Sequence, residues 1–213
     1  MIGRNPAPDC PLCPRLVAFR ERNRQLFPSY FNGAVPGFGD DAPWLLIVGL
    51  APGLHGANRT GRPFTGDYAG DLLYETLDAF GLSRGTYAKE PDDGLALVGC
   101  RISNAVHCVP PENKPTPAEA NTCRVFLNHE IRNTPSITAM IALGTIAHNA
   151  VLSILGMKKS AYPFGHGRVH PLPGLPTLID SYHCSRYNTN TRRLTPEMFH
   201  DVFRTAMTFK PEK

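Results

Sequence analysis

A short apolar run, residues 44–48, leads directly into a glycine- and proline-rich stretch, residues 49–67. An apolar run bounded by breakers is typical of a strand that is buried on both faces. The glycines and prolines that follow disfavour both helix and strand, and glycine lets backbone amides approach a flat or anionic ligand closely. Because His55, Asn58 and Arg62 are packed into this frame, we expect a binding loop rather than a plain surface connection.

Helical and strand patterns alternate along the rest of the chain. Helical patterns cover residues 14–26, 67–80, 145–155 and 196–209, a further helix starts after Thr116, and strand patterns cover residues 95–98 extending towards 102, residues 137–143 and residues 175–179. This alternation implies a parallel sheet with helices on both faces. We therefore predict an α/β fold: a three-layer α/β/α arrangement around a central four-stranded, mostly parallel sheet, in one domain spanning residues 1–213.

Polar clusters follow three of the predicted strands, at residues 49–67, 103–108 and 181–190. Ligands of open α/β sheets bind beyond the carboxyl ends of the strands. We therefore expect the three clusters to meet at one edge of the sheet and form one site. A phosphate-binding P-loop is a weaker candidate there, because no Gly-Lys-Ser/Thr sequence follows the first cluster.

Composition narrows the class of protein. A chain of 213 residues that is 42% hydrophobic can bury one good core, and a net charge of +4 permits nucleic-acid binding without requiring it. No stretch approaches the roughly 20 apolar residues of a membrane span, and the N-terminus lacks the apolar core of a signal peptide. We expect a cytoplasmic protein without membrane contact. Its cysteines are expected to ligate a metal or to be reactive thiols rather than to form disulfides.

Four cysteines form two distant pairs: Cys10 with Cys13, and Cys108 with Cys123. Four thiolates suit either a zinc ion or a [4Fe–4S] cluster, and spacing alone does not separate the two. The alternative, four buried unliganded cysteines, is disfavoured because prolines around each pair indicate loops. Cys100 falls within a strand pattern and is expected in the core, and nothing in the local sequence gives Cys184 a fixed base that would make it a nucleophile.

Two motifs resemble the uracil-DNA glycosylase superfamily, and within it the iron–sulfur type b, or family 5, enzymes. The first motif is Gly49-Leu-Ala-Pro-Gly53 continuing to Thr60-Gly-Arg-Pro-Phe-Thr-Gly-Asp67, and the second runs from Ser181 to Thr189. The resemblance covers nearly the whole chain, and the four cysteines occupy the positions of that group's cluster ligands. Two departures stand out: family 4 enzymes carry Glu where this chain has Leu50, and many superfamily members carry Pro where it has Cys184.

The resemblance implies a repair glycosylase, expected as a monomer, that flips a base out of DNA and cleaves its N-glycosidic bond. Uracil is the implied substrate, with other deaminated bases such as hypoxanthine and xanthine. The implied cofactor is a [4Fe–4S] cluster on Cys10, Cys13, Cys108 and Cys123.

The resemblance also implies a role for each site residue. Asp67 stabilises the sugar cation and positions or deprotonates water, while His183 donates to the departing base. Base contacts are implied for Phe64, the backbone at Ala51, and Asn104. Contacts to the DNA backbone are implied for Ser185, Arg186 and Asn188.

Simpler interpretations stay open for the same residues. Phe64 can be plain core, Asp67 a helix N-cap, His183 a satisfied loop histidine and the basic segment after it a solvated loop. Two rival functions also stay open. One is a non-catalytic iron–sulfur or zinc DNA-binding module, and the other is a small-molecule hydrolase on the same scaffold.

Overall fold

Four parallel strands form the centre of the computed structural model, which describes residues 3–212. They are β2 (Leu45–Gly49), β5 (Cys100–Asn104), β6 (Ala139–Leu143) and β8 (Thr177–Ser181). Two short antiparallel strands, β1 (Phe38–Gly39) and β7 (Val169–His170), close the edges of the six-stranded sheet, in the order β1-β5-β2-β6-β8-β7. Three of the four predicted strands thus lie in the parallel core as β2, β6 and β8, whereas the fourth core strand, β5, begins beyond the pattern at residues 95–98. The two edge strands, each of two residues, show no periodicity that a sequence pattern could reveal.

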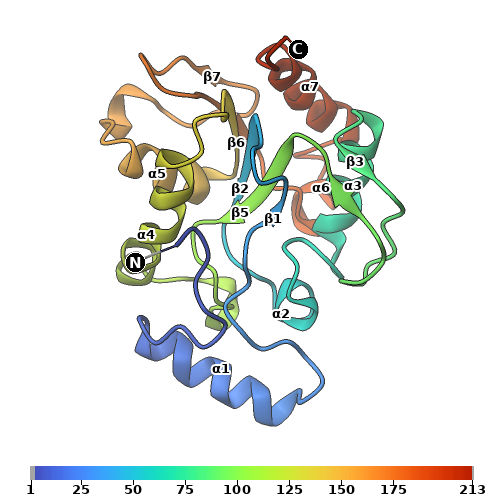
Figure 1. The fold of residues 1–213 in the computed structure, drawn as a ribbon, viewed down its shortest axis with the longest axis vertical. Helices are drawn as coiled ribbons and strands as arrows, with labels where there is room; N and C mark the ends of the chain where they lie inside the picture. Colours follow the sequence, from blue (N-terminus) through green and yellow to red (C-terminus); the bar gives the residue numbers. More distant parts are fainter. Residues whose placement is uncertain (1–2, 213) are drawn as a thin grey trace.

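Helices cover both faces of this sheet, which confirms the three-layer arrangement (Figure 1). Side chains of β2 alternate: Leu45 and Ile47 pack towards α3 (Tyr68–Ala79) and α7 (Pro196–Met207), and Leu46 and Val48 pack towards α4 (Pro117–Arg132) and α5 (Thr145–Ile154). Every residue of β2 is buried. Burial on both faces explains why this strand is a continuous apolar run rather than an alternating one.

Helix starts follow their capping residues. The Thr116 hydroxyl accepts a hydrogen bond from the Glu119 amide, and the Glu119 carboxylate accepts one from the Thr116 amide. These two bonds form a complete capping box at the start of α4. Thr195 caps α7, and Asp67 caps α3. The first helix, α1 (Pro14–Leu26), has the predicted bounds.

Two local predictions are corrected by the structure. The pattern at residues 95–98 does not continue to residue 102, because Gly99 turns the chain with φ +66° and fits its bare α-carbon against Trp44. The segment before the turn becomes β4 (Ala96–Leu97), which pairs with β3 (Ser83–Arg84) in a separate hairpin. Residues 49–67 also contain one helical turn, α2 (Ala57–Thr60), which the glycine frame had disfavoured.

Three short helical segments complete the element order: the 3₁₀ turns η1 (Pro111–Asn113) and η2 (Lys159–Ala161), and α6 (Arg186–Asn190). The helix α1 lies apart from the sheet, at the bottom of Figure 1. Its Leu16 packs into a third apolar cluster with Val106 and Phe126. Among residues 3–212, no helix is both long enough and apolar enough to cross a bilayer.

Candidate active site and cysteine centre

A cavity of about 510 Å³ opens at the carboxyl ends of β2, β5 and β8. The predicted site residues that line it are Ala51, Phe64, Asp67, Asn104, His183, Ser185 and Arg186. They come from all three polar clusters, and the cavity has the volume of a typical small-molecule site. The expectation that the clusters meet at one edge of the sheet is therefore confirmed.

Phe64 forms one wall, and its backbone is in the left-handed region with φ +53°. The Tyr87 hydroxyl bridges this turn, lying 3.3 Å from the Phe64 carbonyl oxygen and 3.3 Å from the Gly66 nitrogen. Burial raises the pKa of Tyr87 to about 12, so the hydroxyl keeps its proton and can donate. On the other side, a Cβ on Gly70 would lie 1.7 Å from the Phe64 carbonyl oxygen, so α3 approaches this turn only because residue 70 is glycine.

Asn104 ends β5 and is 2% exposed. Its Oδ1 atom has no hydrogen-bond partner among the residues that the structure describes. A buried polar atom without a partner is costly, so a ligand that donates to Oδ1 gains more than an ordinary hydrogen bond. A Cβ on Gly49 would lie 2.3 Å from this oxygen and 2.8 Å from the Phe64 ring, so glycine at position 49 makes room for both side chains.

Asp67 caps α3, because its Oδ1 accepts a 3.1 Å hydrogen bond from the Gly70 amide. Its Oδ2 lies beside the α-carbons of Gly53 and Gly56, where an added Cβ would come within 3.2 and 2.3 Å of that oxygen. Burial raises the pKa of Asp67 above its ordinary value, although backbone hydrogen bonds from Gly70 and Ala69 oppose the shift. A carboxylate whose pKa is raised is a better base than a solvated one.

The His183 ring is stacked on Phe64, with centroids 5.8 Å apart and planes at 28°. Burial lowers the pKa of His183 to about 4, so the imidazole is neutral at neutral pH. No described residue makes a hydrogen bond with the ring, whereas the Asn188 side chain donates to the His183 carbonyl oxygen at 2.8 Å. The loop backbone therefore sets where the ring lies.

Comparison with known proteins supports the resemblance of the motifs. A family model described as the uracil DNA glycosylase superfamily matches residues 36–206. A type-5 uracil-DNA glycosylase of Thermus thermophilus is 48% identical over 202 residues, which cover 92% of each chain. Type-5 enzymes of Mycobacterium bovis and Pyrobaculum aerophilum are 45% and 41% identical, covering 92% and 93% of this chain and 76% and 88% of theirs.

The chain belongs to the uracil DNA glycosylase superfamily, and within it to the type-5 enzymes. Both motifs of this type-5 chain reach the cavity, the first through Phe64 and Asp67 and the second through His183.

The segment after His183 forms the rim of the cavity. Ser185 caps α6 by accepting from the Asn188 amide at 3.4 Å. The Arg186 guanidinium lies over the Tyr68 ring, 5.3 Å from its centroid. The Asn188 side chain, by contrast, is engaged inside the loop with His183.

Three polar residues of the first motif point elsewhere. Arg62 forms a buried bidentate ion pair with Asp93, at 2.7 and 2.8 Å. Arg59 pairs with Glu90, and His55 meets the Tyr30 hydroxyl at 3.1 Å. These contacts fasten the loop rather than line the cavity.

Asn113 lines the cavity and was missed from the sequence. It belongs to η1 and has φ +56°, as does Glu112 before it. The left-handed backbone conformation of these two successive residues turns the segment after Cys108 towards the cavity. The only sequence signal was the preceding pair of prolines, which marks a turn but not its direction.

The two cysteine pairs come together as predicted. Cys10, Cys13, Cys108 and Cys123 line one small apolar cavity between α1 and α4. Arg20 is buried beside them; its guanidinium donates to the Cys10 carbonyl at 3.1 Å, while its Nε has no hydrogen-bond partner among the described residues. The nearest carboxylate oxygen to Arg20 Nε is Glu21 Oε1, at the ion-pair distance of 3.8 Å. A buried cation beside the four cysteines favours their anionic form, which suits thiolates that ligate a metal.

Proposed function

We propose that this protein removes uracil, and also hypoxanthine and xanthine, from DNA by flipping the base into the cavity and hydrolysing its N-glycosidic bond. One observation carries the proposal: an unpartnered amide oxygen, an aromatic wall, a carboxylate of raised pKa and a neutral imidazole line one cavity. The type-5 relatives, named as uracil-DNA glycosylases, support the same reaction.

The Asn104 amide matches the edge of a deaminated base. Uracil presents an N–H donor beside a carbonyl acceptor, and hypoxanthine and xanthine present the same pair on their six-membered rings. Asn104 Oδ1 accepts from that N–H, its amide nitrogen donates to the carbonyl, and Phe64 stacks on the ring. Cytosine and adenine present the reverse pattern, which leaves Oδ1 facing an acceptor and costs binding.

Bond cleavage needs charge stabilisation on both fragments. As the base leaves with negative charge, neutral His183 donates a hydrogen bond to its carbonyl oxygen. Asp67 stabilises the cationic sugar and orients or deprotonates the attacking water. Leu50 stands where family 4 enzymes carry Glu, so Asp67 is the carboxylate of the first motif that reaches the cavity.

We infer that the four thiols hold a [4Fe–4S] cluster rather than one zinc ion, and the spacing of the sulfurs supports this choice. Four thiolates around zinc lie roughly 4 Å apart, because each Zn–S bond is about 2.3 Å. No three of the four sulfurs lie within 4.8 Å of one another among the described residues. Cys10, Cys13, Cys108 and Cys123 would hold the cluster, which supplies a covalent tie between the N-terminal segment and α4.

The rim residues Ser185 and Arg186 would bind DNA phosphates, and Asn188 would support them from inside the loop. We infer that the enzyme acts as a monomer, as the resemblance to the family implies.

Release of free base tests the proposal. Purified protein is incubated with matched oligonucleotides, single- and double-stranded, that carry uracil, hypoxanthine, xanthine or thymine at one position. We expect release of the first three bases. Tight DNA binding without release would favour the non-catalytic module, and activity confined to uracil would remove the wider substrate range. Excess free nucleosides serve as the control for a small-molecule hydrolase.

A further inference from the structure

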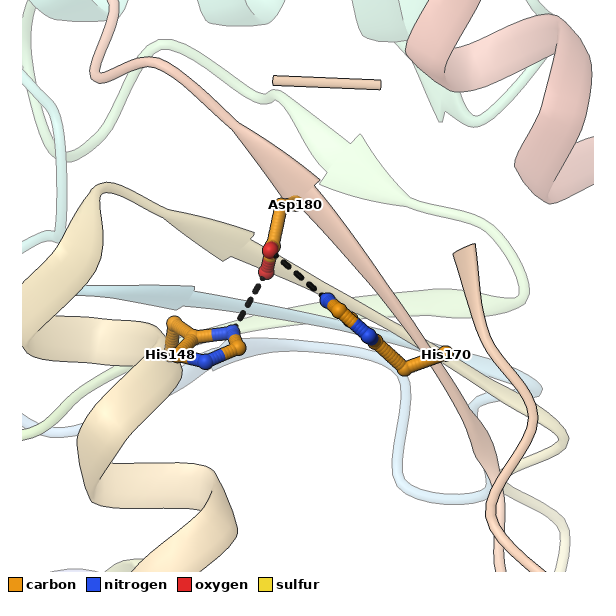
Figure 2. A group of neighbouring side chains, drawn as sticks. All are labelled: His148, His170 and Asp180. Carbon is orange, nitrogen blue, oxygen red and sulfur yellow. Dashed lines mark hydrogen bonds and ion pairs between the residues drawn. The ribbon is translucent and has the colours of Figure 1, made fainter. Parts of the chain in front are cut away.

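A cluster of three buried titratable side chains is not used by the proposed mechanism. Asp180 of β8 lies between His148 of α5 and His170 of β7 (Figure 2). His148 Nδ1 is 2.7 Å from Asp180 Oδ1, and His170 Nε2 is 2.9 Å from Oδ2. All three side chains are buried: His148 is 1% exposed, His170 is 4% exposed and Asp180 is 0% exposed. Burying such groups is costly, so their hydrogen bonds must serve a purpose in the fold or the site.

The cluster is satisfied by hydrogen bonds alone. His148 Nε2 is 2.9 Å from the Tyr162 carbonyl oxygen, and the Gly165 amide donates to Asp180 Oδ2 at 3.1 Å. Both ring nitrogens of His148 thus face oxygen atoms, Asp180 Oδ1 on one side and the Tyr162 carbonyl on the other. A metal ion between the three side chains would have to break these short contacts.

Asp180 lies three positions before His183 in the chain. The Asp180 backbone is also held by hydrogen bonds. Its amide donates to the Arg168 carbonyl at 2.9 Å, and its carbonyl accepts from the Gly167 amide at 2.8 Å. Two residues later, the Tyr182 amide donates to His166 Nδ1 at 3.1 Å. The segment from Tyr162 to His170 is therefore joined to the strand end that leads into His183.

The cluster also joins this strand end to α5. The Gly144 amide donates to the Ser181 carbonyl at 2.8 Å, and the His148 amide donates back to the Gly144 carbonyl at 3.1 Å. A Cβ on Gly144 would lie 3.7 Å from the His183 Cβ. The His148–Asp180 hydrogen bond thus completes a chain of contacts that links α5, Gly144 and the end of β8. This chain includes the backbone next to His183.

We propose that the Asp180–His148–His170 cluster is a positioning device for the His183 imidazole. The inference rests on the proposed role of His183 in base release. Since no described side chain hydrogen-bonds the ring, its place depends on the loop that the cluster fixes. A displacement of about 1 Å in a reacting group can lower the rate roughly a hundredfold.

Asp180→Asn tests the proposal most directly, because the amide nitrogen brings a donor against one of the two imidazole donors. We expect the single-turnover rate on uracil DNA to fall roughly 10- to 100-fold, with less than about a threefold change in affinity for the same DNA. His170→Gln keeps an N–H that can reach the carboxylate, so it should retain most of the rate, whereas His170→Leu should lose it. This matched pair keeps the test intact if Asp180→Asn does not fold.

A second measurement is independent of activity. Nuclear magnetic resonance titration of His183 should give a pKa near 4 in the wild type. In Asp180→Asn and His170→Leu it should move towards 6.5 as the loop admits water. Wild-type protein that releases no base would overturn the proposed function, while this titration would still test the positioning.

Three results would overturn the proposal. One is a rate loss fully explained by the unfolded fraction, and another is equal rates for His170→Gln and His170→Leu. The third is one tightly bound zinc ion per wild-type chain that His170→Gln removes, which would make the cluster a metal site.

Discussion

Asp67 and Gly70 share the hydrogen bond that starts α3, from the Gly70 amide to Asp67 Oδ1. The second oxygen, Oδ2, lies beside Gly53 and Gly56 in the loop that lines the cavity. The helix cap thus uses Oδ1, and the catalytic role that we propose for Asp67 can use Oδ2. They are compatible, and one substitution separates their effects.

Asp67→Asn should cut single-turnover cleavage by at least about a hundredfold, because the variant lacks both the base and the negative charge. Its melting temperature should stay within a few degrees, since an Asn side chain still caps the helix. Affinity for lesion DNA should barely change. Asp67→Ala is the control, because it removes the cap as well and should cost about 1 kcal/mol of stability. Near-normal cleavage by Asp67→Asn would show that the catalytic carboxylate is misassigned.

Gly49→Ala should slow excision strongly by displacing the Asn104 amide and the Phe64 ring, which the new methyl group would meet at 2.3 and 2.8 Å. We expect a rate loss of about a hundredfold or more and a stability loss of about 1 to 3 kcal/mol. Gly3→Ala is the matched control, since its Cβ would meet only the Asn5 carbonyl at 4.0 Å. A fully active Gly49→Ala would refute the assignment of this wall to base binding.

Tyr87→Phe should slow cleavage roughly tenfold, because it removes the hydroxyl that bridges the Phe64 and Gly66 backbone. Tyr30→Phe removes a hydroxyl that meets His55 outside the cavity, and it should leave the rate unchanged. Single-turnover rates on uracil DNA distinguish the two. Equal rates for both variants would mean that the bridge does not set the Phe64 turn.

The free energy of unfolding should fall as the pH drops from about 6.5 to about 4, because of the buried imidazole of His183. Its pKa is lowered from 6.5 to about 4 by burial, so the unfolded chain takes up the proton first. The stability that His183 contributes is complete above pH 6.5 and is lost on acidification. Denaturant titrations across this range should show the loss, and His183→Gln should show a smaller one. An unchanged slope in that variant would mean that other groups carry it.

The cleavage rate should rise with pH through the raised pKa of Asp67, because only the carboxylate acts as a base. The residual rate of Asp67→Asn should lack this dependence. Single-turnover assays between about pH 4 and 8 provide the measurement. A rate that falls with rising pH would contradict the assigned role.

Cys10→Ala should lose bound iron and the brown colour expected of the wild type, and it should melt at a lower temperature. Cys100→Ala is the control, since Cys100 is buried in β5 with its thiol facing the Leu82 carbonyl, and it should keep its iron. Iron and sulfide analysis of both variants measures whether each one keeps its cluster. Zinc in place of iron in the wild type would overturn the metal but leave the thiol centre.

Sequence patterns located β2 and β6 because each is a continuous buried apolar run between breakers. They misplaced β5, whose sequence contains an arginine, a serine and an asparagine. They located the cavity because each motif follows a strand end. They missed Asn113, whose place depends on two left-handed residues in a loop. They also missed the cluster around Asp180, because its partners His148 and His170 meet it only through the crossing of α5 and β7. Side chains brought together by tertiary packing leave no local spacing to detect.

Three glycines lie so close to site residues that an added Cβ atom would clash. They are Gly49 beside Asn104, Gly56 beside Asp67 and Gly70 beside Phe64. In the genetic code, every single-nucleotide missense change of a glycine codon introduces a residue with a Cβ atom. No such change at these three codons preserves the close approach. We therefore expect base preference in this lineage to change through substitutions at neighbours that already carry side chains, such as Leu50 and Ala51, rather than at these glycines.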